Sequence, residues 1–131
     1  MTGPVSVELF ARSSAIDTDF TGKLVDVWPN GFAQNLTEGI VRARYRGSPE
    51  RVDFMNPGGI YKLTIDLWAT SNVFLKGHRL RLEISSSNFP RFDRNLNTGE
   101  DIGRGTRWVK ATNTILHHKE HPSSVLLPVV P

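Results

Sequence analysis

The chain has 131 residues, a hydrophobic fraction of 38%, a charged fraction of 22% and a formal net charge of +3, a composition that predicts one globular domain over residues 1–131. It contains no cysteine, which excludes disulfides, thiolate metal sites and cysteine nucleophiles. It also lacks a run of about 18 apolar residues, so the sequence predicts no membrane-spanning segment and no membrane partner.

The first third of the chain alternates apolar and polar residues with a period of two, the pattern of β-strands. Val5–Ala11 places its apolar residues on one face. Phe20–Trp28 is apolar on both faces, which predicts a central strand. After a tight turn at Pro29–Gly31, Val41–Arg46 alternates apolar residues with arginines. We therefore predict a third strand there, with its arginines facing outward.

The rest of the chain continues the pattern with longer interruptions. Tyr61–Leu67 and His78–Ile84 alternate as strands, and Ser124–Val129 predicts a short edge strand because it contains a proline. Thr106–Lys119 fits either a short helix or another strand. Short strands separated by turns predict an all-β fold, a jelly-roll-type sandwich. Ser86–Gly105 is a polar loop of a length that is usually functional or docked on something.

No catalytic site is predicted from the residues. The chain has no G-x-S-x-G sequence, the turn that exposes a catalytic serine in α/β-hydrolases. His78, Asp93 and the serines Ser85–Ser87 supply the residue types of a triad, which also needs an oriented base and an oxyanion hole. Because His78 lies on the apolar face of its strand, we expect a buried, hydrogen-bonded imidazole instead.

A histidine-rich segment, His117–His121, is the one possible transition-metal cluster. On a helix, His117 and His121 would face the same way, but Pro122 would disrupt that end of the helix. Nothing in the segment resembles the H-E-x-x-H pattern of zinc enzymes. We therefore expect a solvated linker without a metal or other cofactor.

Asp93-x-Asn95-x-Asn97 resembles the beginning of a calcium-binding loop. The central glycine and the closing glutamate of such a loop are missing at the required positions. Turn formation by Asp and Asn side chains is the preferred interpretation, and calcium remains the alternative.

The basic residues are spread along the chain, and no nucleic-acid-binding motif accompanies them, so no nucleic-acid partner is predicted. The first residues, Met1–Pro4, lack the basic and apolar regions of a signal peptide. With no cysteine, this leaves the compartment open and favours the cytoplasm.

Three stretches carry a resemblance to a known family. They are Asp17–Gly31 with Gly39–Arg46, the segment from Ala69–Phe74 through Gly77–Arg79 to Asn95–Gly99, and His121–Pro128. Together they resemble the C-terminal domain of the CocE/NonD hydrolases, which include cocaine esterases, α-amino acid ester hydrolases and X-Pro dipeptidyl-peptidases.

The resemblance implies a jelly-roll sandwich of the galactose-binding-domain type. In that family the Ser-Asp-His triad belongs to a separate α/β-hydrolase part, and no position here matches it. The family's domain begins with further strands upstream, so we expect this chain to start part-way into it. The missing strands would then leave a sheet edge or an inner face uncovered.

We therefore expect a non-catalytic accessory domain that docks on, and braces, the catalytic α/β-hydrolase domain of a larger serine hydrolase. The isolated chain is expected to be inactive. Aromatic and arginine side chains concentrate in interfaces, and the candidates for the docking surface are Trp28, Arg42, Arg44, Trp68, Arg79, Arg81, Asn88, Phe89, Arg91, Asp93, Arg94 and Asn95.

Two alternatives remain open. One is a free-standing module that binds a carbohydrate or another ligand, with sugars stacked on Trp28 and Trp68, which lie in the polar phase of their strands. The other is a homo-oligomer, because an interface face without its partner tends to self-associate.

Overall fold

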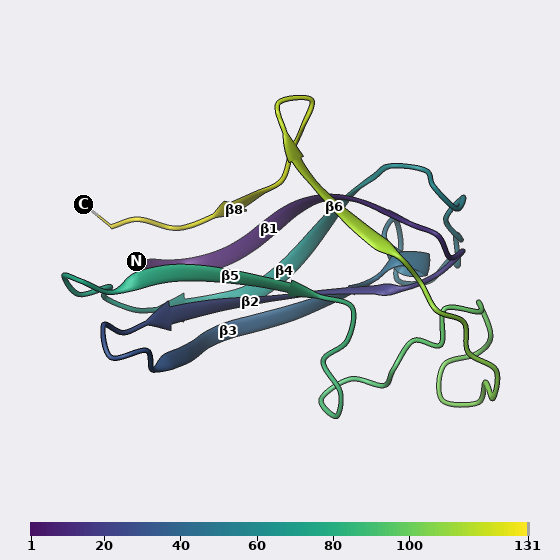
Figure 1. The fold of residues 1–131 in the computed structure, drawn as a ribbon, viewed down its shortest axis with the longest axis horizontal. Coiled ribbons are helices and arrows are strands. Elements are labelled where there is room, and N and C mark those ends of the chain that lie inside the picture. Colours follow the sequence, from purple (N-terminus) through teal and green to yellow (C-terminus); the bar gives the residue numbers. More distant parts are fainter. Residues whose placement is uncertain (131) are drawn as a thin grey trace.

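The structure, a computed structural model that describes residues 1–130, is a sandwich of two antiparallel sheets (Figure 1). The five-stranded sheet contains β4 (Tyr61–Ser71), β1 (Thr2–Ser13), β6 (Asn113–His118), β7 (His121–Pro122) and β8 (Ser124–Leu126), and the three-stranded sheet has the order β3 (Ala33–Arg42), β2 (Asp19–Val27), β5 (Arg79–Ser85). The predicted all-β sandwich is confirmed. None of the helical structure within residues 1–130 is long and apolar enough to cross a membrane.

Strand β1 organises the larger sheet. One of its sides pairs with β4 from Thr2 to Ala11. The other side is shared, because β8 pairs with Ser6–Glu8 and β6 pairs with Phe10–Ser13. Of Thr106–Lys119, which the sequence left open between helix and strand, Asn113–His118 form strand β6 and residues 106–112 form neither.

The core lies between the inner faces of β1, β2 and β4. Its fully buried members are the alternate apolar residues that the period-two pattern places on one face: Val5, Val7, Leu9, Ala11, Phe20, Leu24, Leu63, Ile65 and Leu67. Burying one such Val, Leu, Ile or Phe side chain stabilises the fold by about 1.5–3 kcal/mol. This packing confirms the predicted inward faces of the first and fourth strands.

The third predicted strand, Val41–Arg46, is wrong in its bounds. Strand β3 begins at Ala33 and ends at Arg42, and Ala43–Tyr45 form a short 3-10 helix, η1. The chain leaves the strand because Asp17 accepts hydrogen bonds from the backbone N–H and the guanidinium of Arg44. Arg44 is consequently only 4% exposed, and the prediction that it faces outward is also wrong.

A β-bulge interrupts β4 beside an exposed tryptophan. Pro4 pairs with Ala69 but Ser6 pairs with Asp66, so β4 carries one extra residue at this point. Trp68 has a φ of 65°, and its backbone N–H donates to the carboxylate of Asp66 at 2.8 Å. Trp68 is 67% exposed, as its position in the pattern predicts, and the alternation breaks only after it, at Ala69, as bulges cause.

Strand β3 crosses the same bulge at very close range. A Cβ atom at Gly39 would lie 1.8 Å from the carbonyl oxygen of Asp66. Nearby, the hydroxyl of Thr37 donates to the carbonyl of Leu67. The absence of a side chain at Gly39 is thus what allows the two sheets to meet here.

Substitution of this glycine tests that close approach. Gly39→Ala should lower the free energy of unfolding by at least about 1–3 kcal/mol, because backbone would have to move to admit one methyl group. Gly47→Ala is the matched control, since a Cβ there meets nothing within 4 Å. Urea denaturation of both variants would measure the difference, and equal midpoints would contradict the account.

Candidate functional site

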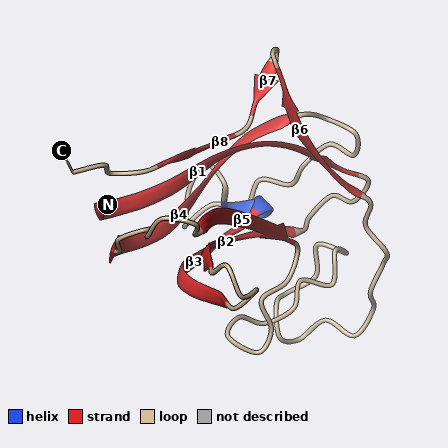
Figure 2. Cartoon of the chain, turned by 60° about the vertical axis from the view of Figure 1, so that its left-hand side comes forward, coloured by secondary structure: helices blue, strands red, loops and turns tan. Residues whose placement is uncertain are grey.

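The segment between β5 and β6 is a long loop that lies against one end of the sandwich (Figure 2). The predicted Ser86–Gly105 loop is confirmed within it. Asn97, Gly99 and Gly103 have φ values of 63°, 78° and 78°, which mark tight changes of direction.

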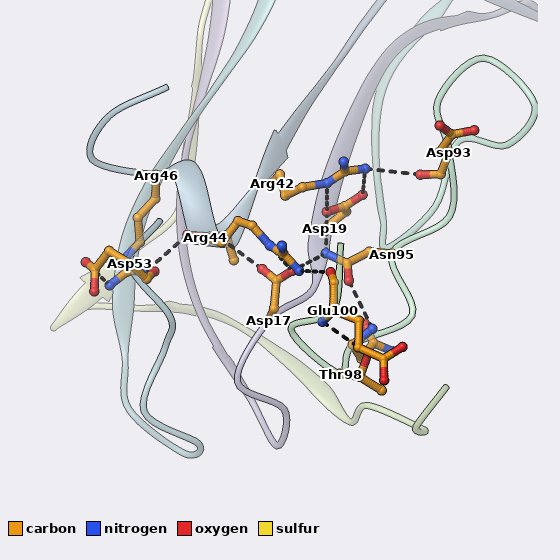
Figure 3. A network of polar contacts seen from close by, with 12 residues as sticks. Asp17, Asp19, Arg42, Arg44, Arg46, Asp53, Asp93, Asn95, Thr98 and Glu100 are labelled. Atoms are coloured by element: carbon orange, nitrogen blue, oxygen red, sulfur yellow. Dashed lines mark hydrogen bonds and ion pairs between the residues drawn. The ribbon is translucent and has the colours of Figure 1, made fainter. Parts of the chain in front are cut away.

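Two buried carboxylates near the start of β2 form the centre of a polar network (Figure 3). Asp17 pairs with Arg44 through an Nε···Oδ2 contact of 2.8 Å. Asp19 accepts two hydrogen bonds from Arg42, at 3.0 Å from Nε and 2.9 Å from Nη2. The side chains of the aspartates are 0% and 2% exposed. Paired donors of this kind fix the geometry as well as the charge.

The network fastens the long loop to the sandwich. Asn95 Nδ2 donates to Asp17 Oδ2 at 2.7 Å and to Asp19 Oδ1 at 2.8 Å. Arg42 Nη2 donates to the carbonyl of Asp93 at 3.1 Å, and Arg44 Nη2 donates to the carbonyl of Glu100 at 2.8 Å (Figure 3). The two ion pairs therefore hold the loop at three residues, Asp93, Asn95 and Glu100.

The environment of Arg42 favours its charged form. The hydrogen bond from Arg42 to Asp19 raises the pKa of the guanidinium, outweighing the effect of burial. Arg42 therefore stays charged, and with it the attraction that keeps the loop in place. A buried charge is costly unless it is paired and hydrogen-bonded, and each of the two carboxylates accepts three hydrogen bonds.

A second contact ties the loop to the outer face of the smaller sheet. Arg91 pairs with Glu38 of β3, which also lies 3.6 Å from Lys23 of β2. Burial acts to raise the pKa of Glu38, but the hydrogen bond from Arg91 and the charges of Lys23 and Arg91 outweigh it, so the pKa lies below its ordinary 4.5.

The Asx interpretation of the loop sequence agrees with the contacts. The side-chain oxygen of Asn95 accepts a hydrogen bond from the backbone N–H of Asn97 at 2.9 Å, and Asn97 Nδ2 donates to the carbonyl of Val109 at 2.9 Å. Asp93 contributes its backbone carbonyl to Arg42. The two asparagine side chains therefore shape the loop, as turn-forming residues do.

The candidate docking residues separate into two groups. Exposed are Trp28, Trp68, Arg79, Arg81, Phe89, Arg91, Asp93 and Arg94, whereas Arg42, Asn88 and Asn95 are half-buried and Arg44 is buried. Arg94 stacks over Phe89, with 4.1 Å between its guanidinium carbon and the ring centroid. Trp68 lies apart from this pair, on β4 of the other sheet.

His78 forms a buried contact, as its place on the apolar face predicts. Its Nδ1 lies 2.9 Å from Asp26 Oδ1, and the two side chains are 9% and 4% exposed. Ser85 is seven positions further along the chain, at the end of β5, and a strand rises about 3.3 Å per residue. The backbones of His78 and Ser85 are thus roughly 20 Å apart, at opposite ends of the strand.

Sequence reasoning missed an apolar groove at the end of the sandwich where the two termini lie. The groove measures about 550 Å³ and is lined by Met1, Thr2, Asn72, Val73, Phe74, Leu80, Leu127, Val129 and Val130. Val73 and Val129 are among the most exposed apolar side chains that the structure describes, at 73% and 80%. The sequence contained one signal for this groove, namely apolar residues in segments that lack the alternation of a strand.

The two antiparallel sheets and their ion-paired loop place the chain in the class of all-β sandwich domains. More narrowly, the chain belongs to the family of X-Pro dipeptidyl-peptidase C-terminal non-catalytic domains, which it matches over residues 1–126. The resemblance carried by the three stretches of sequence is thereby confirmed.

Similar proteins are several times longer. The chain is 52% identical to the cocaine esterase of Rhodococcus sp. (strain MB1 Bresler) over 132 residues, covering 99% of this chain and 23% of that protein. The crystal structure of an aminopeptidase from a marine sediment Thaumarchaeota archaeon superposes with a TM-score of 0.89 at 31% identity, over 95% of this chain and 22% of the other. An α-amino acid ester hydrolase superposes with a TM-score of 0.88 at 28% identity, over 94% and 22%. The chain thus spans less than a quarter of these relatives.

Removing one buried charge should show how strongly the network stabilises the fold. Arg44→Met leaves the Asp17 carboxylate without its cation and should cost about 3–5 kcal/mol. Arg81→Met removes an exposed arginine whose partner, Glu83, lies 3.4 Å away, and should cost less than about 1 kcal/mol. Urea denaturation followed by circular dichroism measures both, and similar losses in the two variants would show that the buried pair has no special role.

Proposed function

We propose that this chain is the accessory domain of a larger serine acyl hydrolase, of the esterase or X-Pro dipeptidyl-peptidase type, and that it docks on and braces the catalytic α/β-hydrolase domain. Family membership carries the proposal. The relatives are hydrolases by name, and the matching segment is about a quarter of their length. Cleavage chemistry would then lie on the catalytic domain, and this domain would contribute shape and stability.

The anchored loop supports one part of the docking surface. Phe89, Arg91 and Arg94 are exposed on a segment that Asn95 and Arg42 hold against the sandwich. Side chains that are already ordered lose less conformational entropy when a partner binds. An aromatic ring with a stacked guanidinium is also the composition that dominates interface energetics.

The apolar groove near the termini supports a second part. Single exposed apolar side chains are ordinary, but contiguous ones mark interaction surfaces. Val73, Leu80, Val129 and Val130 line one groove and are all exposed. Burial of such side chains by a partner would stabilise the assembly at about 25 cal/mol per Å² of apolar surface.

Reconstitution tests the proposal directly. A catalytic core of the Rhodococcus cocaine esterase that lacks its matching segment should gain thermal stability or esterase activity when the purified chain is added. The isolated chain should not react with a fluorophosphonate probe. If neither stability nor activity of the core changes at saturating chain concentration, docking is contradicted.

Matched variants locate the surface. Val73→Asp places a charge in the apolar groove and should reduce the reconstitution at least tenfold, whereas Val52→Asp, at a site 49% exposed elsewhere on the molecule, should leave it unchanged. For the loop, Arg94→Glu should reduce the reconstitution, and Arg12→Glu is the control that should leave it unchanged. Sedimentation of the chain alone should show whether it self-associates. Loss of self-association in Val73→Asp would show that the same groove drives it.

A ligand-binding module is the second candidate, and one observation favours it. Trp108 is 73% exposed and lines a groove of about 700 Å³ together with Ile16, Asn97 and Arg107. Aromatic and polar side chains converging on a concave surface are typical of ligand sites. Titration calorimetry with mono- and oligosaccharides would detect saturable binding that Trp108→Ala removes. Absence of heat at millimolar sugar would exclude carbohydrate as the ligand.

A further inference from the structure

The hairpin between β6 and β7 projects from the sandwich (Figure 1, Figure 2). It carries three side chains of metal-binding type. His118 pairs with His121 across the ladder, and Lys119 and Glu120 form the turn between them. One nitrogen of each histidine and a carboxylate oxygen of Glu120 lie within 4.8 Å of one another. The two imidazole centroids are 5.1 Å apart.

This arrangement corrects the histidine pairing that a helix would produce. In a helix His117 would share a face with His121, but the segment is a β-hairpin in which His117 pairs with Pro122. Neighbouring residues of a strand point to opposite faces. His118, one position further on, is therefore the residue that meets His121. The side chains of residues 117–120 are exposed to solvent, as expected, but the segment is a β-hairpin and not an irregular linker.

His121 is held in place by its surroundings. Its ring lies 5.4 Å from the ring of Phe10 of β1, in an edge-to-face contact. Its Nδ1 is enclosed and has no hydrogen-bond partner among the residues that the structure describes. Imidazole nitrogens in proteins are normally paired, and a partner on one nitrogen sets which atom the other nitrogen offers to a ligand.

We propose that His118, Glu120 and His121 bind a divalent transition-metal ion of the Zn²⁺, Cu²⁺ or Ni²⁺ type. Two imidazole nitrogens and one carboxylate oxygen form a donor set that such ions prefer, with water completing the coordination. Lys119 in the turn is the opposing charge, and the carboxylate of Glu120 offsets it. The bound ion would fasten the tip of the hairpin, where the two imidazoles already meet edge to face.

The test uses the whole chain without an affinity tag, freed of metal by a chelator and titrated with ZnCl₂ in a calorimeter. We expect one ion per chain and a rise of several degrees in Tm with saturating Zn²⁺. His118→Ala and Glu120→Gln should each weaken binding at least tenfold. His117→Ala, a neighbour whose side chain points to the other face, should bind as the parent does.

Three outcomes would overturn the site. They are absence of saturable Zn²⁺ binding below millimolar concentration, an equal loss in His117→Ala and His118→Ala, and a stoichiometry of one ion per two chains with dimer formation in sedimentation. If His118→Ala lowers the Tm of the metal-free chain, the calorimetric affinity of Glu120→Gln still decides the matter, because its side chain is exposed and keeps its shape.

Discussion

Asp17 and Asp19 lie out of contact with water at the junction between the first sheet and the second, where an unpaired carboxylate would cost several kcal/mol. Arg44 and Arg42 supply the compensating charges, Arg42 from the last position of β3 and Arg44 from η1 directly after it. The positions that the two arginines must take then determine the path of the chain around them. Strand β3 has to end at Arg42, and the chain has to turn inward as η1, for both pairs to form.

The same two pairs organise the long loop. Each guanidinium has donors left after binding its aspartate, and these reach carbonyl groups of the loop. Asn95 completes the arrangement by donating to both carboxylates. A segment with little regular secondary structure thus acquires a fixed path from charges that the sandwich had to neutralise in any case. The proposed docking of Phe89 and Arg94 depends on that path.

Local pattern predicted the strands well, because the alternation of apolar side chains is set within a few residues. It failed at Arg44, whose direction depends on Asp17, a residue 27 positions away. The signal in the sequence was an equal spacing: two aspartates at the start of the hairpin and two arginines at its end, each pair two positions apart. The histidines show another limit. Which of them meet depends on whether the segment is helix or strand, and the residues of Thr106–Lys119 did not distinguish the two. The groove of Val73 and Val129 required knowledge of where both chain ends lie.

The close approach of Gly39 to the carbonyl oxygen of Asp66 restricts the register that β3 can adopt. If β3 slid by one position, either Glu38 or Ile40 would present a Cβ atom to that oxygen, and every side chain of the strand would change face. Only the arrangement that brings the one residue without a side chain to this point is sterically open. A single glycine therefore helps to set the position of one sheet along the other, although no backbone hydrogen-bond ladder joins the two sheets.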